Sequence, residues 1–188
     1  MAFPPAHMLV GAGMAELARA GMRSPPPRRA AWLAGALLAS VPDGDIILGI
    51  LLGSGGALHG TFTHSLSAVA VVALLGYAFG GGRWAAIAGL TYGSHLFIDL
   101  LDESGPTNLM LGWPFTGVHA YSLGKLFPKV PVDGDGIVDT ALNVFRPGSL
   151  RNLVLQTLLA AAISLALLLI ARGIRWMRVR RVEPAAAD

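Results

Sequence analysis

The amino-acid sequence predicts an all-α protein: a multi-pass transmembrane helical bundle of about four to five membrane helices with a long non-cytoplasmic loop. Of the 188 residues, 54% are hydrophobic, and the mean hydropathy is +0.60. Charged residues make up only 13% of the chain, against about 25% in typical soluble domains. They lie mainly between long apolar stretches, which is typical of short charged loops that join membrane spans.

The clearest expected span runs from Asn152 to Ala171. It contains no charged residue, and ~20 apolar residues are enough to cross ~30 Å of hydrocarbon. Three further apolar segments are expected upstream, at Ala30–Leu52, Ser65–Gly80 and Trp84–Leu101. The shorter segment His7–Ala20 carries two charged residues, so it either lies at the membrane interface or completes a span when packed against its neighbours.

Lysine and arginine set the expected orientation, because they are enriched in cytoplasmic loops. The arginines at the expected cytoplasmic ends of the spans are Arg23, Arg28, Arg29, Arg83, Arg172, Arg175, Arg178, Arg180 and Arg181. Alternating crossings then place the C-terminus in the cytoplasm. The opposite side receives Gly53–Thr63 and the long loop Asp102–Arg151, which is rich in Pro, Gly and Asp and is expected to hold one short helix near Ile137–Val144.

The chain has no cysteine, so disulfides and thiolate ligands are excluded, and any metal must be held by imidazole and carboxylate groups. The net charge of +3 comes largely from the arginines that follow the last apolar segment. That placement favours an anchor at the membrane surface over nucleic-acid binding. The expected partner is a membrane lipid or a lipid-linked small molecule, and the oligomeric state stays open.

The histidines lie at or near the expected non-cytoplasmic ends of the spans: they are His7, His59, His64, His95 and His119. His95 and Asp99 are four residues apart in a helical segment, so they share a face and can converge on one cation. Pro42–Asp45 interrupts the first long apolar segment. It leaves Asp43 and Asp45 in apolar surroundings, where ionisable groups are costly and usually functional.

Each of these motifs also has a plain structural explanation. A single histidine near a membrane boundary is more often an interfacial polar group than a ligand, and PDGD alone is a turn sequence. His59 and His64 in HGTFTHS need a turn to point together, and Thr61, Thr63 and Ser65 either cap the next helix or orient the rings. A shared cation accounts for the matching depth of all the motifs, so a metal site is the favoured interpretation.

The ordered set AHMLVG, PDGD, HGTFTHS, SHLFIDLL and GWPF resembles the YdjM-like inner-membrane proteins, described as predicted metal-dependent hydrolases, over about Ala6–Ser122. The resemblance implies a bacterial-type inner (plasma) membrane location. It also implies metal-ligand roles for His7, Asp43, Asp45, His59, His64, His95 and Asp99. Where the family often has arginine after the first histidine of HGTFTHS, this chain has Gly60, which removes a potential anion contact. The ligand order is also distantly similar to that of zinc-dependent phospholipase C.

Seven candidate ligands exceed the needs of one tetrahedral zinc with an open position, and they suit two or three cations bridged by Asp43 or Asp45. Zinc is preferred because imidazoles are plentiful, and manganese or iron are the alternatives. The expected function is that of a membrane-bound metal-dependent hydrolase acting on a phosphoester or lipid-linked substrate at the non-cytoplasmic face. The catalytic candidates are Asp43, Asp45 and His119, and further candidate acids or bases are Asp102, Glu103 and Asp139.

Two alternative functions use the same residues. Intramembrane Asp and His beside a Pro-broken helix also describe cation transporters, and a closed site without an exchangeable water describes a structural membrane protein with a non-catalytic metal. In all three cases residues 1–151 are expected to form a membrane-embedded metal-site domain. Residues 152–188 are expected to form a C-terminal transmembrane helix and a basic cytoplasmic tail.

Overall fold

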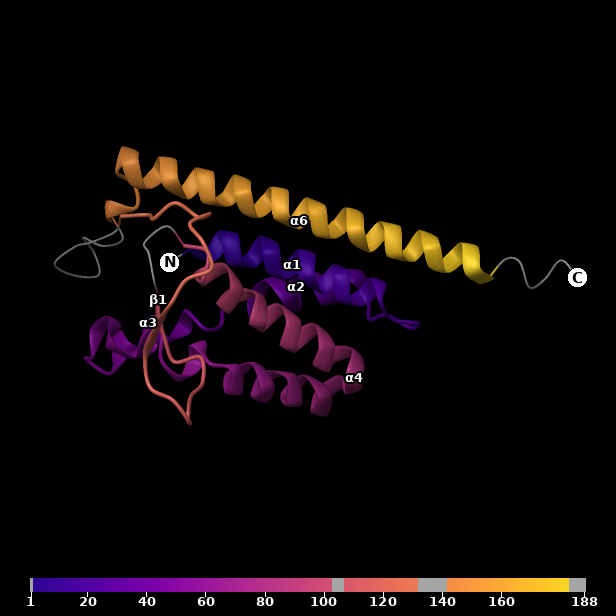
Figure 1. The fold of residues 1–188 in the computed structure, drawn as a ribbon, viewed down its shortest axis with the longest axis horizontal. Helices are drawn as coiled ribbons and strands as arrows, with labels where there is room; N and C mark the ends of the chain where they lie inside the picture. The colour runs from indigo at the N-terminus through magenta and orange to yellow at the C-terminus, as the bar shows by residue number, and fades with distance from the viewer. Residues whose placement is uncertain (1, 103–106, 132–141, 183–188) are drawn as a thin grey trace, which may run out of the picture.

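A computed structural model describes residues 2–102, 107–131 and 142–182 of the chain. The described chain is mostly helical, which confirms that part of the predicted fold, and the longer helices pack into one elongated bundle (Figure 1). The helices are α1 (Pro4–Ala20), α2 (Arg28–Leu38), α3 (Gly44–Leu51), α4 (Leu66–Asp99) and α6 (Pro147–Val182), with short 3₁₀ helices η1 (Gly55–Leu58) and η2 (Phe62–His64). A small antiparallel sheet pairs β1 (Thr107–Leu109) with β2 (His119–Tyr121).

Helix α1 lies at the centre of the bundle, in contact with α2, α4 and α6. Glycines bring α1 and α2 together: a Cβ on Gly11 would lie 2.3 Å from the carbonyl oxygen of Gly35, and a Cβ on Gly35 would lie 2.6 Å from that of Gly11. The segment His7–Ala20 is therefore helical and packed against its neighbours, and the expectation that it completes a membrane span in this way stays a prediction.

Helix α4 is a hairpin of two helical arms. The break falls at Gly80 and Gly81, and Gly81 has a φ of 70°, which residues with a side chain rarely adopt. The arms pack closely, since a Cβ on Gly76 would lie 2.8 Å from the Cβ of Ala88. The two arms match the two apolar segments that the sequence predicts on either side of residues 81–83.

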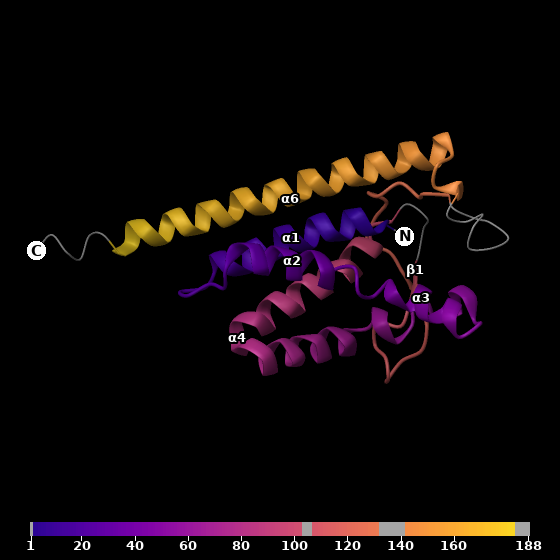
Figure 2. The same ribbon diagram turned by 180° about the vertical axis from the view of Figure 1, so that it is seen from behind.

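The interruption expected at Pro42–Asp45 separates α2 from α3. Pro42 has no backbone N–H to continue a helical hydrogen-bond ladder, and the backbone turns between Leu38 and Gly44. The segment Ala30–Leu52 is thus two helices rather than one continuous span. Both views place α3 beside β1, at the end of the bundle that holds the N-terminus (Figure 1, Figure 2).

By length and composition, two described helices could cross a membrane, Leu66–Asp99 in α4 and Pro147–Arg180 in α6, but the bend at Gly80 and Gly81 divides the first into two shorter arms. The expected total of four to five membrane helices and the long non-cytoplasmic loop stay predictions. The short helix expected near Ile137–Val144 lies largely outside the described residues.

A buried carboxylate joins three helices at the other end of α1. Glu16 is 1% exposed and accepts hydrogen bonds from Arg19 at 2.6 Å, from Trp32 of α2 at 2.8 Å and from Arg175 of α6 at 2.5 Å. Burial alone would raise the pKa of Glu16, but the hydrogen bonds from Trp32, Arg19 and Arg175 outweigh it and lower the pKa.

Glu16→Gln is expected to destabilise the protein by about 1.5–3 kcal/mol, the range for hydrogen bonds to charged groups. Because the pKa of Glu16 is lowered on folding, its contribution is present above the unfolded pKa of about 4.3 and is lost as the pH falls through the folded value. The melting temperature in detergent should therefore fall more steeply on acidification in the wild type than in the variant. Arg29→Ala, at an exposed arginine of α2, is the control and should change little. Equal acid sensitivity of wild type and Glu16→Gln would contradict this role.

Candidate metal centre

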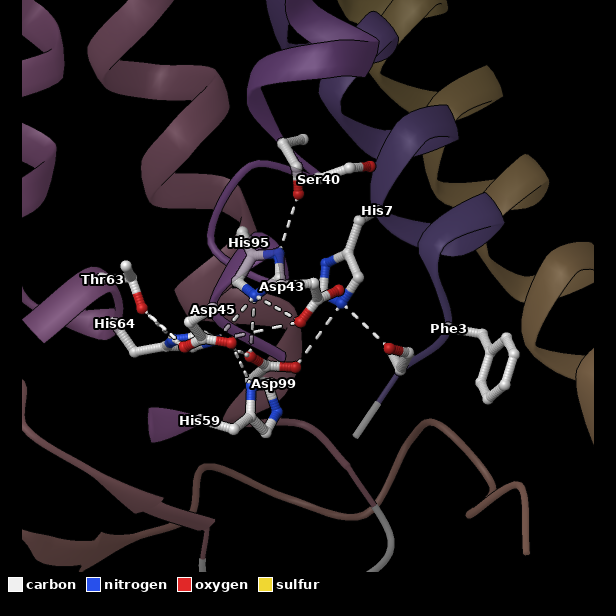
Figure 3. Close-up of polar contacts among 12 residues, drawn as sticks. Phe3, His7, Ser40, Asp43, Asp45, His59, Thr63, His64, His95 and Asp99 are labelled. Carbon is white, nitrogen blue, oxygen red and sulfur yellow. Dashed lines mark hydrogen bonds and ion pairs between the residues drawn. The ribbon is translucent and has the colours of Figure 1, made fainter. Parts of the chain in front are cut away.

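The structure brings all seven predicted ligands together in one cluster, where their side chains point toward one another (Figure 3). They come from separate elements: His7 from α1, Asp43 from the turn after α2, Asp45 from α3, His59 from the segment between η1 and η2, His64 from η2, and His95 and Asp99 from α4. His7, His64, His95 and Asp99 are fully buried. The side chains of Asp43 and His59 are each 14% exposed, so these two residues form the accessible edge of the cluster.

On α4, His95 and Asp99 face the same side, as their spacing predicts. Nε2 of His95 lies 3.1 Å from Oδ2 of Asp99. Nδ1 of His95 lies 2.8 Å from the carbonyl oxygen of Ala39. A carbonyl oxygen can only accept, so Nδ1 carries the hydrogen, and Nε2 of the neutral ring then presents a lone pair to the cluster.

The ring of His64 is oriented in a similar way. Its Nδ1 lies 3.2 Å from Oδ2 of Asp45 and 3.0 Å from Oγ1 of Thr63. Donation to the ionised Asp45 carboxylate leaves a lone pair on Nε2 of His64, which lies 3.1 Å from Nε2 of His95. Two facing lone pairs repel each other, so this arrangement favours a proton or a cation between them.

Four atoms surround the space beside these two rings: Nε2 of His64, Nε2 of His95, Oδ1 of Asp43 and Oδ2 of Asp99. The distances between them include 3.1 Å (His64 to His95), 3.5 Å (His95 to Asp43), 3.1 Å (His95 to Asp99), 3.6 Å (His64 to Asp99) and 3.9 Å (His64 to Asp43). In a tetrahedral zinc site with bonds of ~2.0–2.2 Å, ligand atoms are roughly 3.3–3.6 Å apart. The donor set and its spacing therefore fit one divalent cation.

His7 extends the cluster on the other side of Asp99. Nε2 of His7 lies 3.5 Å from Oδ1 of Asp99 and 3.1 Å from the carbonyl oxygen of Ala2. Its ring stacks on that of His95, with the centroids 3.8 Å apart. The buried Nδ1 of His7 has no hydrogen-bond partner among the described residues. The two oxygens of Asp99 thus face different imidazoles. Because the carbonyl oxygen of Ala2 can only accept, Nε2 of His7 carries the hydrogen in this arrangement and would have to lose it for His7 and Asp99 to hold a cation together through these atoms.

Two sets of three residues also have ligand atoms within 4.8 Å of one another. They are His7, His95 and Asp99, and Asp43, His59 and His64. The two sets interlock through the contact between His64 and His95. The residues present therefore fit either one cation at the centre or a pair that divides the cluster.

Asp45 occupies a different position from the other carboxylates. It is 2% exposed, and it accepts hydrogen bonds from Nδ1 of His59 at 2.8 Å and from Oγ1 of Thr63 at 2.6 Å, besides its contact with His64. Burial alone would raise the pKa of the Asp45 carboxyl, but these hydrogen bonds outweigh it and hold the pKa well below its usual range. Both oxygens of Asp45 are thus engaged in fixing the two rings.

Asp45→Asn is expected to weaken metal binding by about 10–100-fold without abolishing it, the usual effect of losing a group that orients a ligand. Asparagine keeps the shape of the side chain but replaces one accepting oxygen with an amide nitrogen, so His59 or His64 loses its fixed orientation. Chelator competition on the purified protein measures the change. Asp43→Asn is the comparison: if both variants lose the metal equally, Asp45 is a direct ligand instead.

The other predicted catalytic candidates lie apart from these contacts or outside the described residues. His119 is exposed in β2, with its ring 6.1 Å from that of Tyr121. Asp102 is buried, and its backbone pairs with that of Phe127 in an isolated parallel β-bridge. Glu103 and Asp139 lie outside the described residues. The catalytic assignments of all four stay predictions.

Two groups that support the cluster are absent from the sequence interpretation. The carbonyl oxygen of Ala39 orients His95, and no side-chain pattern could identify a backbone group. The hydroxyl of Tyr92 donates to the carbonyl oxygen of Thr63 at 2.8 Å and so fixes η2 against α4. Tyr92 precedes His95 by three residues, so it lies on the same face of the helix, and that spacing was a usable signal.

A family model described as YdjM inner membrane protein matches residues 1–179 of the chain. No curated protein and no solved structure matches it.

Proposed function

The chain belongs to the YdjM inner membrane protein family, and from that premise we propose that it is a membrane-bound metal-dependent hydrolase of phosphoester or lipid-linked substrates. The observation that carries the proposal is the convergence of His64, His95, Asp43 and Asp99: the two imidazoles lie 3.1 Å apart, and each lies 3.1–3.9 Å from both carboxylates. Family membership and the two long apolar helices support a location in the membrane.

Those four residues would hold a first divalent cation, and His7 would help to hold a second beside Asp99. The sequence interpretation puts the bridge on Asp43 or Asp45, but the contacts favour Asp99 because its oxygens face His7 and His95 separately. Zinc suits the imidazole-rich set, and manganese or iron suit the carboxylates. When bound, such cations would acidify a nearby water and stabilise negative charge developing on a phosphoryl oxygen.

The residues at the accessible edge take the remaining roles in hydrolysis. The oxygen of water forms a bond to phosphorus, the bond from phosphorus to the leaving oxygen breaks, and one proton of the water passes to a carboxylate. Asp43 is our candidate for that carboxylate because it is partly exposed; Oδ1 faces the imidazoles, so Oδ2 would take the proton. Asp45 stays ionised and holds His59 and His64 in place. The leaving oxygen takes up a proton from solvent.

A structural metal site is the second candidate function. The observation in its favour is the full burial of His7, His64, His95 and Asp99, since closed sites hold structural zinc. The partial exposure of Asp43 and His59 favours catalysis, because a substrate needs an approach. A transport pathway fits less well, because the cluster takes His7 from near the start of α1 and Asp99 from the end of α4 rather than residues spread along these helices.

The test is hydrolysis by detergent-purified protein of a soluble phosphodiester and of a long-chain lipid phosphate, with zinc, manganese or iron added. We expect turnover by the wild type and none by Asp99→Asn. His119→Ala tests whether His119 is catalytic, as the sequence analysis expects. Loss of turnover in this variant with its metal retained would give His119 a catalytic role rather than a role in holding metal. A wild type that holds metal but hydrolyses neither substrate would support the structural alternative.

We also propose that the C-terminus is cytoplasmic and that the cluster faces the opposite side of the membrane. Support comes from α1, where Glu16 lies nine residues beyond His7, ~13 Å along the helix, and bonds to Arg19 of the same helix and to Arg175 of α6. Ser24 belongs to the same end, because its carbonyl oxygen accepts a hydrogen bond from Arg83.

Single-cysteine labelling tests this orientation, because the natural chain has no cysteine. Ser122→Cys should react with a membrane-impermeant maleimide in intact cells, and Ser24→Cys should react only after the membrane is permeabilised. Both serines are exposed, so the side of the membrane decides the result. The reverse pattern of labelling would overturn the orientation.

A further inference from the structure

An apolar groove runs between α2 and the hairpin α4. It has a volume of about 450 Å³, and its lining includes Leu38, Val41, Val72, Leu75, Phe79 and Trp84. Helix α4 is apolar enough to lie in a membrane, and Leu75 and Phe79 are 53% and 89% exposed. The natural neighbours of this groove are therefore the hydrocarbon chains of lipids.

The turn between α2 and α3 belongs to both the groove and the metal cluster. The carbonyl oxygen of Ala39 holds His95 in the cluster, Val41 lines the groove, and Asp43 faces His64 and His95. Within the turn 39–43, residues that contact the cluster (Ala39 and Asp43) flank a residue that lines the groove (Val41). The groove and the cluster therefore approach each other at this turn.

The arms of α4 give the groove its direction. Val72 follows His64 by eight residues and Ala88 precedes His95 by seven, so each lies ~10–12 Å from the cluster along its arm. The lining then continues to Phe79 and Trp84, at the hairpin bend. Phe79 lies ~20 Å beyond the start of α4. One membrane leaflet is ~15 Å deep, so the first arm of α4 is long enough to run through one leaflet.

We propose that this groove holds one hydrocarbon chain of a lipid phosphate whose phosphate group lies at the metal cluster. The inference rests on the proposed function and names its substrate class. The apolar lining matches the chain, and a cluster that holds cations matches the anionic head. Val41 of the lining lies two residues from Asp43 of the cluster, so one molecule could place its chain in the groove and its head at the cluster, and a soluble phosphoester would leave the groove unused.

The test is photo-crosslinking in proteoliposomes with a phosphatidic acid that carries a diazirine in the middle of one acyl chain, beside the matching diacylglycerol probe. Leu75→Trp should fill the groove, and Leu74→Trp is the matched control because Leu74 is 68% exposed on the same arm but does not line the groove. Mass spectrometry locates the crosslinks, and the rate of hydrolysis of long-chain and soluble substrates is measured in parallel.

We expect the phosphate probe to label the groove residues of α2 and α4 about tenfold more than the diacylglycerol probe does. Leu75→Trp should remove that labelling and lower kcat/KM for the long-chain substrate about tenfold, while turnover of the soluble phosphodiester and the behaviour of Leu74→Trp stay unchanged. Crosslinks spread evenly over α4 and α6, unaffected by Leu75→Trp, would overturn the inference even if lipid phosphates are hydrolysed. Phosphate-dependent groove labelling without hydrolysis of any phosphoester would overturn the proposed function and leave the binding site standing.

Discussion

Asp99→Asn is expected to abolish the stabilisation that added zinc gives to the metal-free protein. Asp99 is fully buried, its Oδ2 lies 3.1 Å from His95, and its Oδ1 lies 3.5 Å from His7. A ligand at about 1,000 times its Kd stabilises a folded protein by about 4 kcal/mol. The amide of asparagine supplies no negative charge at either position, so the variant should gain almost none of this stabilisation.

The measurement is the melting temperature of chelator-treated protein in detergent before and after titration with zinc. His119→Ala is the matched control, because it also removes a candidate residue, but one that is exposed in β2 with its ring against Tyr121. It should keep the full zinc response. A zinc-dependent rise in Asp99→Asn equal to that of the wild type would mean that the cation binds elsewhere.

Gly11→Val is expected to destabilise the fold severely and to remove metal binding from a distance. Any Cβ at this position would lie 2.3 Å from the carbonyl oxygen of Gly35 and 2.5 Å from the Cβ of Ala39, so α1 and α2 would have to separate. Overpacking of this kind costs typically 1–3 kcal/mol, and more where the backbone must shift. His7 lies one turn before Gly11 on α1, and Ala39 holds His95, so both sides of the cluster would move.

Thermal unfolding and metal content of Gly11→Val are measured beside those of Gly173→Ala. Gly173 lies in α6 with nothing within 4 Å of its Cβ direction, so its replacement should stabilise slightly through helix propensity. Normal stability and full metal content in Gly11→Val would show that the close approach of α1 and α2 does not position the cluster.

The sequence predicts much of this arrangement from local rules. The spacing of His95 and Asp99 places both on one face of α4. Pro42 predicts the break between α2 and α3, which leaves Asp43 in a turn rather than in a helix. The apolar segments on either side of residues 81–83 predict the two arms of α4. Each of these depends on helix periodicity or on proline and glycine chemistry, which act over a few residues.

The different roles of the two aspartates in the cluster could not be predicted from these local rules. Asp43 and Asp45 are equivalent in the sequence, yet Asp43 faces His95 while Asp45 accepts from His59 and Thr63. That difference depends on how α2, α3 and the η2 turn pack against α4. It is set by contacts between residues far apart in the chain, for which a single sequence carries no periodic signal.

The most direct test of the account is the metal content of wild-type protein, measured by elemental analysis and X-ray absorption after purification in detergent. We predict about two equivalents of zinc, or of manganese or iron, with imidazole and carboxylate ligands at ~2.0–2.2 Å. Protein that is folded but metal-free, and that takes up none of these cations when they are added, would contradict the metal centre and the hydrolase proposal that depends on it.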